Sequence, residues 1–79
     1  MWNYRVLIDK DHFMTIHEVH YDGEGRPVAW TEKPVRVGGE SIVELDWELQ
    51  QLREAIDRPP LRIRGKRLVE ERMEVRTRK

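Results

Sequence analysis

The histidine, carboxylate and hydroxyl side chains are the groups in this sequence that could do chemistry. His17 and His20 are three residues apart, so in an extended strand they point to opposite faces and cannot share a metal ion. The acidic turns lack the twelve-residue spacing and closing Glu of a calcium loop. Ser41 fits a helix cap better than a nucleophile. We therefore predict a non-enzyme without catalytic, cofactor-binding or metal-binding residues. A less favoured hypothesis is a small enzyme that uses His17 or His20 with nearby carboxylates.

Two absences from the sequence narrow its class. The chain of 79 residues contains no cysteine, which excludes disulfides and thiolate metal sites. No apolar run approaches the ~20 residues of a membrane helix, and the first five residues do not resemble a signal peptide. We expect a cytoplasmic protein with no membrane partner. A domain this small needs good packing or association with another chain.

Basic side chains gather near the end of the sequence. Residues 1–57 carry a net charge of −6 and residues 58–79 a net charge of +6. This asymmetry predicts a segment that binds its own partner or folds onto the acidic body. Such a segment could neutralise nucleic-acid phosphates, although it has no aromatic residue to stack on a base. The candidate nucleic-acid-binding residues are Arg62, Arg64, Lys66 and Arg67.

Three strands that would support these residues are predicted in the first half of the chain. Residues 2–8 alternate so that one face is apolar, and residues 13–21 are rich in aromatic and β-branched types. The second run changes phase, so we expect a β-bulge near His17. Residues 22–25 predict a tight turn into a third strand over residues 27–31. The apolar face of the first strand consists of Trp2, Tyr4, Val6 and Ile8.

A helix over residues 42–57 is the strongest local prediction. Ser41 followed by Glu44 forms a capping-box pattern, and Pro59–Pro60 ends the helix. Apolar residues at spacings of three and four form a stripe of roughly 80°, which is typical of a helix packed on a sheet. The stripe consists of Ile42, Leu45, Leu49, Leu52 and Ile56.

Trp47 lies roughly opposite that stripe on the helix. Either the returning end of the chain or a loop covers it, or it is a contact for a protein partner or a second copy. We name Trp47 as the candidate partner-binding residue.

The end of the chain is predicted to form an extension of a small α+β domain. Residues 61–64 alternate apolar and basic types, which indicates a short fourth strand. Leu68, Val69 and Met73 indicate either one or two helical turns or a disordered end. The expected architecture is an antiparallel three-stranded meander packed on one helix, in the order β-β-β-α-β. The expected division is a domain over residues 1–61 and a basic extension over residues 62–79.

Residues 2–61 contain a succession of short motifs, which are Trp2-Asn3-Tyr4-Arg5-Val6, Ile16-His17-Glu18-Val19, Tyr21-Asp22, Gly25, Pro27, Trp30-Thr31, Pro34-Val35 and Gly39-Glu40-Ser41. This succession resembles a family of short uncharacterised bacterial proteins. The family carries no assigned activity, and residues 62–79 extend past its end.

The lead into the helix, Gly39-Glu40-Ser41, is also similar to the N-terminal domain of HicB-type antitoxins. That resemblance implies a β-β-β-α-β order and binding of a small protein toxin. The small core, the position of Trp47 off the apolar stripe and the exposed edges of the predicted sheet lead us to expect a non-enzymatic protein-interaction module that self-associates or binds a protein partner. The alternative is a nucleic-acid-binding accessory protein that uses the basic extension.

Overall fold

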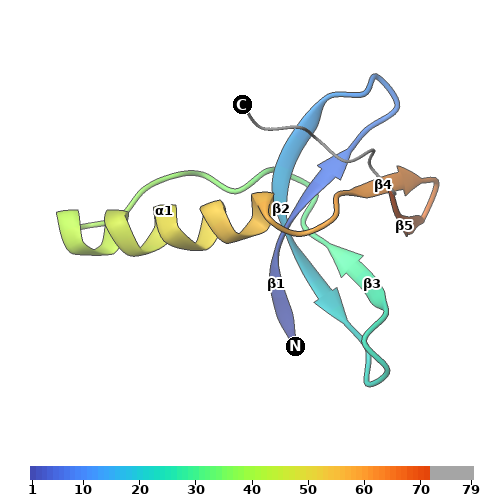
Figure 1. Ribbon diagram of the computed structural model, residues 1–79, viewed down its shortest axis with the longest axis horizontal. Helices are drawn as coiled ribbons and strands as arrows, with labels where there is room; N and C mark the ends of the chain where they lie inside the picture. Colours follow the sequence, from blue (N-terminus) through green and yellow to red (C-terminus); the bar gives the residue numbers. More distant parts are fainter. Residues whose placement is uncertain (72–79) are drawn as a thin grey trace.

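The computed structural model describes residues 1–71, which form a small α+β fold of one helix and a five-stranded sheet (Figure 1). The expected class is confirmed. The expected fourth strand is also present. In chain order the elements are β1 (Trp2–Ile8), β2 (Met14–Tyr21), β3 (Pro27–Trp30), α1 (Ile42–Ile56), β4 (Leu61–Arg64) and β5 (Arg67–Glu70).

The sheet is mixed, with the strand order β3-β2-β1-β4-β5. β1, β2 and β3 form the expected antiparallel meander. β4 then pairs parallel to β1, which requires a long crossover, and α1 supplies it. The meander is therefore one part of a larger sheet that the helix connection completes.

The predicted bulge near His17 is wrong. β1 and β2 pair without interruption from Trp2↔His20 to Ile8↔Met14. The irregularity lies at His20/Tyr21, on the side of β2 that pairs with β3. His17 fits the inner face of a regular strand because its ring nitrogens lie 2.8 Å from the Thr15 hydroxyl and from the Thr31 carbonyl oxygen.

The helical turns predicted around Leu68 and Val69 are wrong, because both residues lie in strand β5. Gly65 adopts a φ of 62° in the turn between β4 and β5, which glycine tolerates, and a hairpin follows. The sheet thus extends past residue 61 to Glu70. Met73 and the rest of the extension lie outside the described residues.

The main hydrophobic core lies on the side of the sheet that faces away from α1. Leu7, Val19 and Leu61 are its buried centre. The edge strands β3 and β5 contact each other, so the sheet curls around this centre. Partly buried residues surround it: Tyr21, Trp30, Ile63 and Leu68. The apolar face predicted for β1 points instead toward the helix side, where Ile8 is buried and Trp2 is half exposed.

Helix α1 begins with the predicted cap. The Ser41 hydroxyl accepts the amide of Glu44 at 3.1 Å, and the Glu44 carboxylate accepts the amide of Glu40 at 2.9 Å. A Cβ at Gly39 would lie 2.8 Å from the backbone nitrogen of Leu45, so this close approach requires glycine. The helix contacts β1 near its C-terminal end, and its N-terminal end projects away from the sheet (Figure 1).

Candidate functional site

Helix α1 leaves most of its apolar stripe uncovered. The side that contacts the sheet carries Leu52 and Ala55, and at 100° per residue it is turned about 70° from the middle of the stripe. Ile42 is 80% exposed, Leu49 is 48% exposed and Ile56 is 45% exposed. The prediction that the whole stripe packs on the sheet is therefore wrong. The rotation agrees with the hydrogen bond from Tyr4 Oη to Glu48 Oε2 (3.0 Å), which places Glu48 against β1.

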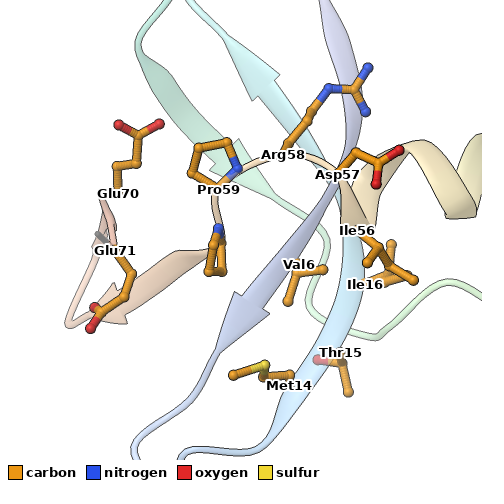
Figure 2. A pocket seen from close by; sticks show the side chains of 11 residues that line it. Val6, Met14, Thr15, Ile16, Ile56, Asp57, Arg58, Pro59, Glu70 and Glu71 are labelled. Carbon is orange, nitrogen blue, oxygen red and sulfur yellow. The ribbon is translucent and has the colours of Figure 1, made fainter. Parts of the chain in front are cut away.

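An apolar groove of about 830 Å³ continues this uncovered stripe (Figure 2). Its apolar lining comes from Val6 of β1, Met14 and Ile16 of β2, and Ile56 of α1. Pro59 and Pro60 form a further wall, and the acidic side chains of β5 and the following residue lie across from β1 and β2 (Figure 2). Ile56 belongs to both the stripe and the groove, so the two form one continuous apolar surface.

We call this continuous feature the docking surface. It consists of Ile42, Leu49 and Ile56 on α1, with Val6, Met14 and Ile16 in the groove. The sequence identified the helix residues as apolar. It did not show that they would stay exposed, because the rotation of α1 depends on contacts with β1.

Trp47, the predicted partner-binding residue, lies outside the docking surface. Its side chain is 56% exposed, and within residues 1–71 neither a loop nor the returning chain buries it. Val43, one helical turn earlier, is exposed on the same side of α1. Together they form a second, smaller apolar spot.

The four predicted nucleic-acid-binding residues divide into two groups. Arg62 Nε donates to Glu71 Oε1 at 2.9 Å, and this hydrogen bond lowers the pKa of the Glu71 carboxyl group. Arg64 and Arg67 face each other at the end of the β4–β5 hairpin, and Lys66 lies in the turn between them. The structure therefore brings three of these cations together and gives Arg62 an acidic partner within the chain.

Arg5 is a buried charged residue, although the alternation of residues 2–8 placed it on the face of β1 opposite the apolar one. It is only 8% exposed, donates to Tyr21 Oη at 2.9 Å and also donates to the carbonyl of Pro59. Tyr21 Oη donates in turn to Asn3 Oδ1 at 2.7 Å. Arg5 therefore links the meander to the segment between α1 and β4. The alternation carries no signal for this role, because its partners lie far away in the sequence.

The other chemically capable residues have local structural partners. His17 is buried between two threonines, and His20 lies on the other face, 3.6 Å from Glu18. Ser41 caps the helix. Within residues 1–71, no three His, Asp or Glu side chains are arranged to hold a metal ion.

The described part of the chain contains no helix long and apolar enough to cross a membrane. Comparison with known proteins found no matching family model, no matching curated protein and no matching solved structure.

Proposed function

We propose that this chain is a non-enzymatic protein-interaction module that binds its partner through the docking surface. The observation that supports this most directly is the exposure of Ile42, Leu49 and Ile56 on one side of a projecting helix. Full burial of an aliphatic side chain of this size contributes about 1.5–3 kcal/mol. Contiguous exposed apolar surface on a small protein is typical of an interaction site.

The groove supports the same proposal. It offers an apolar pocket next to Ile56 in which a partner side chain can be anchored. Asp57, Glu70 and Glu71 lie at its edge with Arg58, so its rim is predominantly acidic. A partner with an apolar anchor and a neighbouring cation fits this chemistry. The strand and helix order, with the lead into α1, supports the HicB-like character of the module as part of this proposal.

A pair of helix variants tests the docking surface. Leu49→Glu places a charge in the middle of the exposed stripe, and Gln51→Glu adds the same charge outside it. In a capture experiment, we expect a protein that binds the wild-type chain and the Gln51→Glu chain not to bind the Leu49→Glu chain. The captured protein, once purified, should show the same order of affinities by calorimetry. Equal affinity for all three chains would place binding elsewhere.

A second candidate function is supported by the tip of the β4–β5 hairpin. Like charges directly opposite each other in a hairpin are destabilising, and Arg64 faces Arg67 there. Within residues 1–71, no carboxylate lies within ion-pair distance of Arg64, Lys66 or Arg67. A nucleic-acid phosphate between the two arginines would relieve their repulsion.

Salt-dependent binding to a DNA or RNA duplex tests this alternative. We expect a double Arg64→Gln, Arg67→Gln chain to bind more weakly. The slope of the logarithm of its binding constant against the logarithm of salt concentration should fall by the amount expected for about two lost phosphate contacts. A double Lys33→Gln, Arg36→Gln chain loses the same charge at exposed positions elsewhere and should retain the slope. Equal slopes for the two double variants would exclude the hairpin tip as the contact.

A further inference from the structure

The exposed side of α1 has a self-complementary order of side chains. Ile42, Leu49 and Ile56 repeat every seven residues, as one of the two apolar positions of a coiled-coil heptad does. Asp46 and Arg53 lie between them, also seven residues apart and on the same side of the helix. Along the helix the exposed side therefore reads apolar, acidic, apolar, basic, apolar.

When a second helix runs in the opposite direction, this order places apolar residues opposite apolar residues and acidic residues opposite basic ones. If a second copy of α1 lies antiparallel and the two cross beside Leu49, Asp46 of each helix faces Arg53 of the other. Ile42 of each helix then faces Ile56 of the other. Such a pairing is isologous, because both helices use the same patch and a two-fold axis relates them.

The charged residues are free to make these contacts. Arg53 is exposed in the last turn of α1, and within residues 1–71 it lies in no ion pair. Asp46 is also exposed, and within residues 1–71 the one hydrogen bond of its carboxylate is accepted from the side-chain amide of Gln50 at 2.9 Å. Glu48 lies on the other side of the helix, hydrogen-bonded to Tyr4, and is not available for a parallel pairing with Arg53.

The shape of the fold also favours the antiparallel arrangement. The N-terminal half of α1 projects from the sheet, and the C-terminal half lies against β1 (Figure 1). An antiparallel pair places each projecting half beside the sheet-bound half of the other copy. Ile42 would then reach the end of α1 where Ile56 and Met14 line the groove. A parallel pair would instead bring both sheets to the same end.

We propose that the occupant of the docking surface is a second copy of this chain, bound through an antiparallel α1 pair with two Asp46–Arg53 ion pairs. The proposal rests on the proposed function and specifies its partner. The apolar contacts supply the affinity, and the two ion pairs select the antiparallel orientation.

Charge reversal tests the orientation. We expect the full chain to sediment as a dimer at low ionic strength. Asp46→Arg and Arg53→Asp should each raise the dimer dissociation constant by at least about tenfold, because each places like charges opposite each other. An equimolar mixture of the two variants should form a heterodimer of wild-type affinity. The double variant Asp46→Arg, Arg53→Asp should regain the homodimer, which also shows that the single variants fold.

The outcomes separate this inference from the proposed function. A monomeric wild-type chain, or charge variants that dimerise as well as wild type, would overturn the antiparallel pair. If Leu49→Glu still abolishes dimers that the charge variants leave intact, the surface binds a copy in another orientation and only this inference fails. If the dimer survives Leu49→Glu, both fail. Gln51→Glu should leave the dimer unchanged and serves as the matched control.

Discussion

Tyr4 is one of the residues through which the sheet contacts the helix. Its hydroxyl donates to Glu48 at 3.0 Å. Burial of the ring, followed by the hydrogen bond and the negative charge of Glu48, raises the pKa of Tyr4 to about 12 from 10.0. Because the folded state favours the neutral phenol, this contribution to stability is fully present below pH 10. It is lost as the pH rises from 10 to about 12.

Replacing Glu48 separates the causes of this shift. We expect Glu48→Gln to lower the pKa of Tyr4 below 12 but to leave it above 10, because burial is the larger cause and remains. An ultraviolet absorbance titration, taken as the difference from a Tyr4→Phe chain, reports the Tyr4 phenol alone. Glu44→Gln, on the same helix but away from Tyr4, should not move it. A Tyr4 titration unchanged in Glu48→Gln would show that the two side chains do not interact in solution.

Residue-scale roles could be read from the sequence only where they depend on near neighbours. The capping role of Ser41 follows from Glu44, three residues later, and the structure confirms it. The burial of Arg5 could not be foreseen, because its hydrogen-bond acceptors are Tyr21 and the carbonyl of Pro59. A charged residue is buried only where such partners meet it, and the two acceptors come from two segments that lie far apart in the sequence.

In helix α1, too, some features follow from neighbouring residues and others depend on contacts with distant parts of the chain. Local chemistry determines where the helix begins, how it is capped and that it ends before Pro59. The helix spans Ile42–Ile56, one residue shorter than the predicted range of 42–57. The side that faces the sheet does not follow from the stripe. Ala55 permits close contact with β1, and the Tyr4–Glu48 hydrogen bond lies on the same side. The docking surface is the part of the stripe that this rotation leaves uncovered.

The cap should matter more here than in a fully packed helix, because the N-terminal turn of α1 has little contact with the sheet. We expect Ser41→Ala to lower the free energy of unfolding by about 1 kcal/mol, with a loss of helical signal by circular dichroism. Ser41→Asp retains an acceptor for the Glu44 amide and should lose only a few tenths. Urea denaturation of the three chains gives the comparison. Equal losses in Ala and Asp would show that the hydroxyl acceptor is not the stabilising feature.

For the whole molecule, the parallel pairing of β4 with β1 was the feature least accessible from sequence. It pairs Leu7 with Leu61, across the entire meander and helix. Local alternation predicted that residues 61–64 form a strand, but it carries no signal for the partner strand or its direction. The curling of the sheet, which brings β5 to β3, depends on that pairing and was also missed.

Leu68 and Val69 of β5 allow a test of whether this curled sheet is one cooperative unit. Leu68 packs against the core of Leu7, Val19 and Leu61, whereas its neighbour Val69 is 42% exposed on the other face.

We expect Leu68→Ala to lower the free energy of unfolding by about 1–2 kcal/mol, less than a fully buried leucine because the site is only partly covered. Val69→Ala should change it by less than about 0.5 kcal/mol. Chemical denaturation followed by tryptophan fluorescence includes the signal of Trp30, which packs on the same core from β3, together with the signals of Trp2 and Trp47. If Leu68→Ala shifted the transition no more than Val69→Ala, β5 would be an appendage of the meander and helix. A clear difference between these two adjacent positions would make residues 67–70 part of the folding unit that carries the docking surface.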